Sequence, residues 1–288
     1  MYNKIILGTA QFGMKYGIAN NSGKIQYPEI SRILNFLHKK KIKFLDTAFA
    51  YGVSEKEIGN FYKKKKKKFK IITKLSFKNN MDIIDQYESS LESLGYAPSI
   101  ILAHNYKDYL NLNFHKQIKI LKKKYFIKKV GVSLYNIDEL EKILAYKKPN
   151  FVQIPINIFD QRFLDEKVLK KLESRSIKII ARSVFLQGLL FKKPNFIFKN
   201  FKNVENNFLK SLEIAKKEKM NLGQLSLNWV YHLKKINNIV FGVDNLKHLK
   251  ENFKIIKKKI TKKSIDEIKK INLNNNKIIK PYLWKIKQ

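Results

Sequence analysis

Short apolar runs alternate along the chain with longer stretches in which apolar residues recur at helical spacing. The apolar runs are continuous, which is typical of strands covered on both faces, as in a parallel sheet. The predicted strands span residues 4–8, a segment that ends at Asp46, and residues 69–74, 99–104, 129–133, 151–155, 177–183 and 238–242. The predicted helices span residues 28–40, a segment from Ser54, and residues 81–95, 114–124, 137–145, 165–174, 204–219 with an extension at 223–233, 246–256 and 263–271.

Eight strand–helix units follow one another without a linker. Strands that alternate with helices predict a parallel sheet, and eight units can close into a barrel. We therefore predict the α/β class, with a single (β/α)8 TIM barrel over residues 1–271 and a C-terminal tail over residues 272–288. A doubly wound open sheet is the alternative, but its Gly-x-Gly-x-x-Gly phosphate loop is absent after the first strand.

Local motifs mark the ends of several helices. Pro28 suits a first helical turn, and Gly95 suits a C-terminal stop. Ser54 followed by Glu57 predicts a capping box at the start of the helix after the second strand. Residues 63–68 are all lysine, and they predict a solvated turn that leads into the third strand.

Polar side chains close the predicted strands. Four of them recur at intervals of 28, 30 and 29 residues, about one strand–helix unit each: Asp46, Lys74, His104 and Ser133. Residues separated by whole units occupy equivalent places around one rim of a barrel, and the carboxyl-terminal rim carries the chemistry in such folds. Gln153 and Ser183 hold comparable places in the sixth and seventh strands. With Tyr51 in the loop after Asp46, these groups are expected to converge on one mouth.

The strand-end residues suit one chemical task. A phenol such as Tyr51 has an ordinary pKa near 10, and a neighbouring ammonium lowers that pKa by stabilising phenolate. Lys74 can supply the ammonium, Asp46 can hold Lys74 in place, and His104 can position a carbonyl oxygen. The set is therefore suited to donate a proton to oxygen while hydride reaches carbon. No side chain delivers hydride, so a nicotinamide cofactor is implied.

Composition narrows the classes of partner. Lys and Arg number 60 against 23 acids, a net charge of +37 that would attract nucleic acid, anionic lipid or phosphate-bearing ligands. The lysines are spread along the whole chain and Arg is scarce, so we attribute the charge to composition and do not expect a nucleic-acid partner. The absence of cysteine excludes disulfides and thiolate metal sites. Without a membrane-length apolar run or a signal peptide, a cytoplasmic location is expected and no membrane partner; the oligomeric state is left open.

Several motifs together resemble the aldo-keto reductase family over nearly the whole chain. The matching segments are 7-LGTAQFG-13, 44-FLDTAFAYGVSEKEIG-59, 73-TKL-75, 102-LAHN-105, 131-GVS-133, 153-QIPINIFDQ-161, 187-QGLL-190 and 249-LKEN-252. The ordered combination of Asp-Thr-Ala, Tyr-Gly-x-Ser-Glu and Thr-Lys is specific. The particular forms 7-LGTAQFGMKYGIAN-20 and 183-SVFLQGLL-190 look like a bacterial branch associated with surface-polysaccharide or sugar metabolism, which suggests a sugar or sugar-derived carbonyl as substrate.

The resemblance implies an NAD(P)H-dependent reductase of aldehydes or ketones that needs no metal. It implies a catalytic tetrad, with the second residue as general acid: Asp46, Tyr51, Lys74 and His104. It also implies these cofactor-binding residues: Gly8, Thr9, Asp46, Ser133, Gln153, Arg182, Ser183, Gly242, Glu251 and Asn252. Within that set, Ser133 and Gln153 match positions that hold the nicotinamide carboxamide.

The chain departs from the family pattern in three places. Leu134 stands where an Asn usually follows the serine of the fifth strand. Arg182 replaces the tyrosine that stacks on nicotinamide, so it is expected either to stack there or to form a salt bridge in the rim. Gly242 and His248 stand where a basic pair usually grips a 2′-phosphate. The family favours NADP(H) over NAD(H), and Lys247 and Lys250 are the candidate substitutes for that pair.

Two other functions remain as alternatives. A barrel of this kind can act as a nucleotide-sensing binding protein without catalysis, and a lysine-rich surface can bind nucleic acid. In the tail, Tyr282 and Trp284 are expected either to line the substrate pocket or to pin the tail to the barrel.

Overall fold

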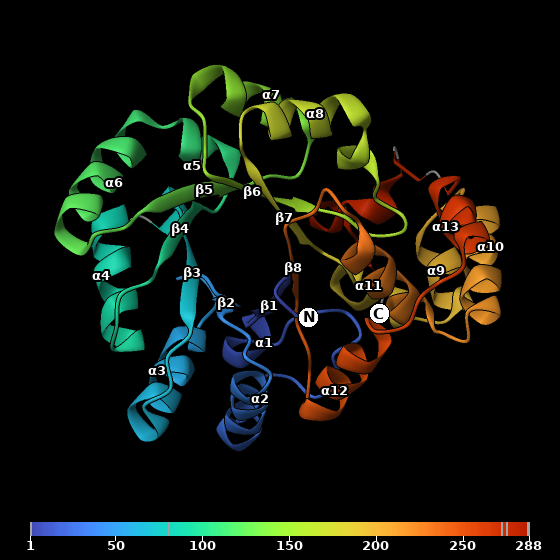
Figure 1. Cartoon of the computed structure of the whole chain (residues 1–288), viewed down its shortest axis with the longest axis horizontal. Helices are drawn as coiled ribbons and strands as arrows, with labels where there is room; N and C mark the ends of the chain where they lie inside the picture. The colour runs from blue at the N-terminus through green and yellow to red at the C-terminus, as the bar shows by residue number, and fades with distance from the viewer. Residues whose placement is uncertain (1, 80, 272, 275, 287–288) are drawn as a thin grey trace.

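The computed structural model of the chain describes residues 2–79, 81–271, 273–274 and 276–286. Its strands are β1 (Ile5–Gly8), β2 (Phe44–Asp46), β3 (Lys70–Leu75), β4 (Ile100–Ala103), β5 (Lys129–Ser133), β6 (Phe151–Pro155), β7 (Lys178–Arg182) and β8 (Asn238–Phe241). All are parallel, each pairs with the next, and β8 pairs with β1, so the sheet closes. Figure 1 looks into this ring, with the helices arranged around it. The predicted (β/α)8 barrel is confirmed.

Thirteen helical segments are found in the part of the chain that the structure describes. They are α1 (Ala10–Gly13), α2 (Tyr27–Lys39), α3 (Ser54–Lys65), α4 (Ile83–Leu94), α5 (Tyr106–Leu110), α6 (Leu112–Tyr125), α7 (Ile137–Tyr146), α8 (Glu166–Ser174), α9 (Pro194–Asn200), α10 (Glu205–Lys217), α11 (Leu222–His232), α12 (Leu246–Ile255) and α13 (Lys262–Lys269). Short 3-10 turns are η1 (Phe77–Asn79), η2 (Arg162–Leu164), η3 (Leu186–Phe191), η4 (Lys277–Ile279) and η5 (Pro281–Leu283). None of these helices is both long and apolar enough to cross a membrane.

The predicted extension of the seventh helix is wrong. The segment divides into α10 and α11 because Lys219 takes a left-handed conformation at φ 54° and ends the first helix. Asn221 then caps α11, where its side chain accepts a hydrogen bond from the backbone N–H of Gln224 and the Gln224 side chain accepts one from Asn221. The hydrophobic period continues across the break, so periodicity alone does not reveal it.

The capping box predicted at Ser54 is also wrong. Val53 precedes the first residue of α3, and the fully buried Ser54 hydroxyl donates instead toward the backbone oxygen and the hydroxyl of Thr9, at 2.9 and 2.8 Å. A hydroxyl buried without a partner would be unfavourable, and Thr9 supplies one from the loop after β1. Two other predicted helix ends are confirmed, since Pro28 lies in the first turn of α2 and Gly95 ends α4 at φ 72°.

The lysine run joins a helix to a strand rather than forming only a turn. Lys63 to Lys65 complete the last turn of α3, and Lys66 leaves it at φ 54°. All but Lys67 are exposed. The cations therefore lie near the negative end of the helix dipole, where they are favoured.

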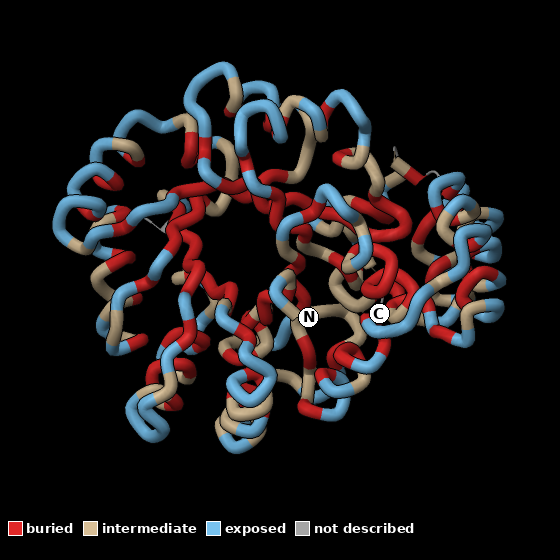
Figure 2. Tube along the Cα trace, in the orientation of Figure 1, coloured by how far each residue is buried: buried red, intermediate tan, exposed pale blue. Residues whose placement is uncertain are grey.

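Two apolar layers hold the barrel together. The larger lies between the strands and the inward faces of the helices, where Figure 2 shows buried residues along the ring and exposed residues on the outer helix surfaces. The smaller fills the barrel interior and consists of Ile6, Phe44, Ile72, Ile100, Leu102, Phe151, Ile180 and Val240. Side chains alternate along a strand, so the residue two positions after an interior residue also faces the barrel axis. That rule determines which side chains form the next layer toward the carboxyl ends of the strands.

Candidate active site

A single layer above the apolar interior contains most of the predicted site residues. Two positions beyond an apolar interior residue stand Gly8, Asp46, Lys74, His104, Gln153, Arg182 and Gly242, and Ser133 stands two positions beyond Gly131, which lies against the interior residues Leu102 and Phe151. They line a cavity of about 410 Å3 together with Thr9, Tyr51, Ser183, Glu251 and Asn252. The structure thus brings every predicted site residue to one cavity at the carboxyl ends of the strands.

The floor of the cavity holds a buried ion pair. The Lys74 ammonium donates to one carboxylate oxygen of Asp46, to the backbone oxygen of Thr47 at 3.1 Å, and toward the Tyr51 hydroxyl at 3.4 Å. Lys74 and Asp46 are 2% and 3% exposed, so water does not screen their attraction. Burial by itself lowers the pKa of Lys74 and is the largest single influence, but the charges of Asp46 and Tyr51 and the hydrogen bonds to both together outweigh it, so the pKa lies above its usual value. Lys74 is therefore a cation.

Gln153 completes the contacts of Asp46. Its side-chain amide donates to the second carboxylate oxygen at 2.6 Å, across the barrel from β6 to β2. Both oxygens of Asp46 therefore have partners, one of them charged. The resemblance predicted only a cofactor contact for Gln153, and this second contact was not predicted.

The Tyr51 ring is positioned by its backbone. The loop that carries it lies against α1 so closely that a Cβ at Gly13 would lie 1.7 Å from the Tyr51 carbonyl oxygen and 2.6 Å from the Ser54 nitrogen. Gly52 follows at φ 55°, a conformation that favours glycine. The ring meets His104 edge-on, with centroids 6.2 Å apart, and Lys74 lies 5.0 Å from its centre.

His104 is held neutral. Burial, together with the positive charges of Lys74, Arg182 and Lys78, lowers its pKa to about 3. Across the ordinary pH range its ring carries one N–H and no net charge. It can offer a hydrogen bond to a carbonyl oxygen without acting as an acid.

Arg182 joins the ends of β5 and β7. Its guanidinium donates to the Leu134 carbonyl at 2.9 Å and to the Ser183 hydroxyl at 3.0 Å, and it lies 4.1 Å from the centre of the Tyr135 ring. Among the described residues it forms no ion pair, so the predicted rim salt bridge is wrong. Its Nε is buried and has no hydrogen-bond partner. Ser183 follows at φ 57°.

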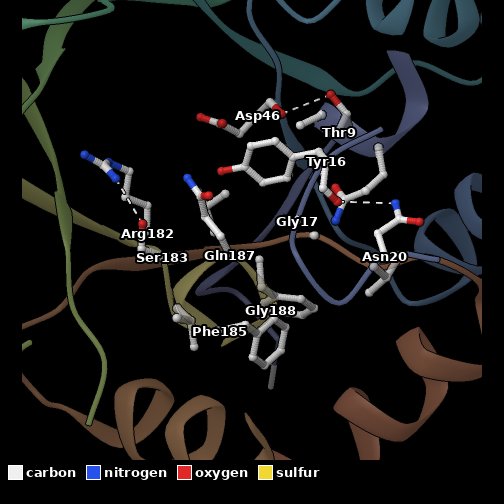
Figure 3. Close-up of a pocket in the computed structure, with 18 of the residues that line it drawn as sticks. Thr9, Tyr16, Gly17, Asn20, Asp46, Arg182, Ser183, Phe185, Gln187 and Gly188 are labelled. Carbon is white, nitrogen blue, oxygen red and sulfur yellow. Dashed lines mark hydrogen bonds between the residues drawn. The ribbon is translucent and has the colours of Figure 1, made fainter. Parts of the chain in front are cut away.

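The loops that follow β1 and β7, the two strands on either side of β8, meet at the wall of the cavity. Gln187 accepts a backbone hydrogen bond from Ile18 at 2.9 Å, and both glycines at this contact, Gly17 and Gly188, have positive φ. Figure 3 shows the Tyr16 ring between Asp46 and Gln187, with Arg182 across the pocket. Tyr16, Tyr135 and Gln187 also line the cavity and were not predicted from the sequence. The glycines at 17 and 188 are the sequence feature that could have indicated tight loops here.

The far end of the cavity is built by β8 and α12. It is lined by Gly242, Val243, Asp244, His248, Glu251 and Asn252, whereas Lys247 and Lys250 are outside the lining. The Nδ1 of His248 lies 3.9 Å from Asp244. Burial raises the pKa of Asp244, and His248 partly offsets this. Asn245 caps α12, where its side chain accepts from the backbone N–H of His248 at 2.8 Å.

The tail packs beside the cavity. Tyr282 meets the Tyr135 ring edge-on with centroids 4.9 Å apart. Trp284 packs on Phe201, and its ring N–H donates to the Lys277 and Ile278 carbonyls, both at 3.1 Å. Tyr282 thus contacts a residue of the cavity wall, while Trp284 fixes the tail.

Comparison with known proteins places these residues in context. The model of the aldo/keto reductase family matches residues 4–273. Aldo-keto reductase str7 of Strobilurus tenacellus is 23% identical over 296 residues, which cover 92% of this chain and 86% of that protein. Aldo-keto reductase YhdN of Bacillus subtilis (strain 168) is 27% identical over 169 residues, 53% of this chain and 50% of that protein.

Solved structures share the fold. Aldo-keto reductase AKR11C1 from Bacillus halodurans, in its holo form, superimposes with a TM-score of 0.74 at 17% identity, over 94% of this chain and 92% of that one. The thermostable aldo-keto reductase Tm1743, in complex with the inhibitor epalrestat, gives a TM-score of 0.71 at 20% identity, over 93% and 94%. At these identities the likeness extends to the fold alone.

Proposed function

Because the chain belongs to the aldo/keto reductase family, we propose that it reduces an aldehyde or ketone with NAD(P)H and that Tyr51 is the general acid. The observation that carries this proposal is a pair of buried contacts: the Lys74 ammonium donates to the Asp46 carboxylate and also toward the Tyr51 hydroxyl. A buried lysine whose charge is maintained by a carboxylate, and which is directed at a phenol, suits a proton donor that must become an anion during the reaction.

The cavity suits a nicotinamide cofactor. It extends from the tetrad to α12, and its polar lining offers amide, hydroxyl and backbone partners along that length. The residues that would hold the cofactor are Gly8, Thr9, Asp46, Ser133, Gln153, Arg182, Ser183, Gly242, Glu251 and Asn252. When bound, the cofactor supplies the hydride that the side chains cannot.

Proton transfer falls to the tetrad. The Tyr51 hydroxyl donates its proton to the carbonyl oxygen of the substrate, and Lys74 stabilises the phenolate that remains. Asp46, which is fixed by Gln153, holds the Lys74 ammonium in place. His104, neutral because its pKa is about 3, donates an N–H to the same oxygen and stabilises the developing negative charge.

The family favours NADP(H), and we carry that preference over to this chain. The far end of the cavity supports it through His248 and through the backbone N–H groups at the start of α12, which can meet a phosphate. Asp244 and Glu251 line the same end and oppose a second negative group. We therefore expect a smaller preference for NADPH over NADH than a pair of permanent cations would give.

The test is oxidation of NADPH and NADH against a panel of carbonyl compounds that includes sugar-derived aldehydes and ketones. The Tyr51→Phe variant removes the proton donor and should lower kcat by about 10²–10⁴-fold. Tyr146→Phe, on the outer surface of α7, is the matched control and should behave as wild type.

Turnover by Tyr51→Phe equal to wild type would refute the role of Tyr51. Cofactor binding by the wild type without oxidation of either cofactor by any carbonyl would favour the non-catalytic binding protein instead.

A further inference from the structure

The charges at the catalytic end of the cavity leave one cation uncompensated. Lys74 is paired with Asp46, and His104 is neutral. Arg182 is permanently charged, and no carboxylate of the described residues forms an ion pair with it. Its charge acts on the site, since it is one of the charges that lower the pKa of His104. Among the residues that line the catalytic end of the cavity, the positive charge of Arg182 is therefore left without a neighbouring carboxylate before any ligand binds.

The hydrogen-bonding groups of Arg182 are only partly used. A guanidinium has five N–H donors, and Arg182 uses one for the Leu134 carbonyl and one for the Ser183 hydroxyl. The Nε donor is buried without a partner. Because that atom is buried, the donors left for a ligand are the second N–H of each of the two terminal nitrogens, and an anion that accepts from them would be stabilised.

The contacts of Arg182 also fix its orientation. Tyr135 covers one face of the guanidinium at 4.1 Å, and the bonds to Leu134 and Ser183 anchor two of its nitrogens. A guanidinium anchored in this way loses little further freedom on binding a ligand. Its planar fork matches the two oxygens of a carboxylate or the oxygens of a phosphate.

We propose that Arg182 recognises an anionic group of the substrate, so that the natural substrate is an aldehyde or ketone that also carries a carboxylate or a phosphate. This inference rests on the proposed reductase function and adds the substrate class. The anion lies at Arg182 while the carbonyl oxygen lies at Tyr51 and His104, within one cavity. A purely structural Arg182, tying β5 to β7, is the competing explanation.

Pairs of substrates that differ in charge test the proposal. Succinic semialdehyde is compared with butanal, and glyceraldehyde 3-phosphate with glyceraldehyde, so that the two pairs separate carboxylate from phosphate. We expect the wild type to prefer the anionic member of at least one pair by roughly 10- to 100-fold in kcat/KM, the range of a charge-assisted hydrogen bond. Equal kcat/KM within both pairs would overturn the proposal.

Two variants separate recognition from structure. Arg182→Tyr removes the charge and restores the aromatic residue usual in the family, and it should abolish the preference for the anionic member. Arg182→Lys retains the charge without the fork and should retain part of the preference. Lys78→Met is the matched control, because the charge of Lys78 also lowers the pKa of His104 but Lys78 is exposed and lies outside the cavity lining. The Lys78→Met variant should prefer the anionic substrates as strongly as the wild type does. If Arg182→Tyr instead lowered kcat/KM equally for the anionic and the neutral member of each pair, the structural explanation would be supported.

Direct binding distinguishes failure of this inference from failure of the reductase proposal. Succinate and inorganic phosphate are titrated by calorimetry into the wild type, Tyr51→Phe and Arg182→Tyr. We expect at least one anion to bind the first two proteins equally and to bind Arg182→Tyr at least about tenfold more weakly. Retained binding by Arg182→Tyr would refute the role of Arg182, whether or not the enzyme turns over.

Discussion

The catalytic end and the far end of the cavity differ in how their charges are held. At the catalytic end, Asp46 and Lys74 are almost completely buried and every oxygen of the carboxylate has a partner. At the far end, His248 is half exposed and lies 3.9 Å from Asp244, and that contact is ionic only when the histidine is protonated. The first arrangement is specific and fixed, whereas the second is open to solvent and weak.

Under the proposed function, the difference follows from what each end has to do. Proton transfer needs a particular phenol beside a particular cation, so moving any member removes the function. Holding a large cofactor draws on many contacts, and a lost cation can be compensated by backbone donors or another side chain. The chain accordingly keeps the family pattern in the tetrad and departs from it at Leu134, Arg182, Gly242 and His248.

Breaking the buried ion pair should have the largest effect. Lys74→Met leaves the Asp46 carboxylate buried without a cation, which should destabilise the protein by about 3–5 kcal/mol. It also removes the group that stabilises phenolate, so kcat should fall by about 10²–10⁴-fold. Urea unfolding and steady-state kinetics measure the two effects.

The matched control is Lys70→Met, an exposed lysine in the same strand, which should leave both quantities near wild type. Adding Asp46→Asn to Lys74→Met removes the unpaired charge and should recover part of the stability but none of the activity. Full activity in Lys74→Met would show that the ion pair serves folding alone.

Alanine substitutions at two glycines test how tightly the backbone is packed at the two ends of the cavity. Gly13→Ala places a Cβ against the backbone of Tyr51 and Ser54, which cannot retreat without moving the phenol. We expect a loss of about 1–3 kcal/mol of stability and of about 100-fold in kcat. Gly242→Ala meets the side-chain amide of Gln11 at 2.5 Å, and that flexible group can turn away.

For Gly242→Ala we therefore expect a change in stability below about 1 kcal/mol and a change in cofactor affinity with little change in kcat. Circular dichroism melts, cofactor titration and kinetics on both variants make the comparison. A Gly242→Ala variant as impaired in kcat as Gly13→Ala would contradict the assignment of separate tasks to the two ends.

The sequence was sufficient to predict the ring of site residues because a parallel barrel repeats at a nearly constant interval. Asp46, Lys74, His104 and Ser133 each close a strand, and whole-unit spacing places strand ends on one rim. The interior layer below them follows from the same alternation of side chains. These features depend on local periodicity, which the chain carries in each unit.

Features that depend on contacts between distant segments were not predictable. The bond from Gln153 to Asp46 crosses the barrel, and the meeting of Ile18 with Gln187 depends on the conformation of two loops. For Arg182 the sequence offered stacking on nicotinamide or a salt bridge, and it gave no sign of the contacts with the Tyr135 ring and the Leu134 carbonyl. Which acceptor a long side chain finds is decided by the assembled rim, and no spacing rule encodes it.

His104, at the catalytic end of the cavity, should make the stability of the protein depend on pH. The pKa of His104 is about 3 in the folded protein and near 6.5 when unfolded, so the unfolded chain binds the extra proton between these values. The contribution of His104 is fully present above pH 6.5 and declines as the pH falls toward 3, by at most about 1.4 kcal/mol per pH unit. Urea unfolding from pH 8 to 4 should show this slope in the wild type.

His104→Asn should flatten that slope. An unchanged slope in His104→Asn would mean that other groups account for the acid sensitivity.

The smallest expected effect concerns the choice of cofactor at the far end. His248→Arg supplies a permanent cation at the start of α12, where it can form a charge-assisted hydrogen bond with a 2′-phosphate. Affinity for NADPH should rise by about tenfold while affinity for NADH stays nearly constant, because only NADPH carries that phosphate. Quenching of tryptophan fluorescence on titration with each cofactor measures both constants, and Lys250→Arg, outside the cavity lining, is the matched control. If the affinity for both cofactors rises equally, the 2′-phosphate does not reach residue 248, and the far end contacts a part that the two cofactors share. If only NADPH gains while kcat is unchanged, affinity has been adjusted at one end of the cavity without disturbing proton transfer at the other.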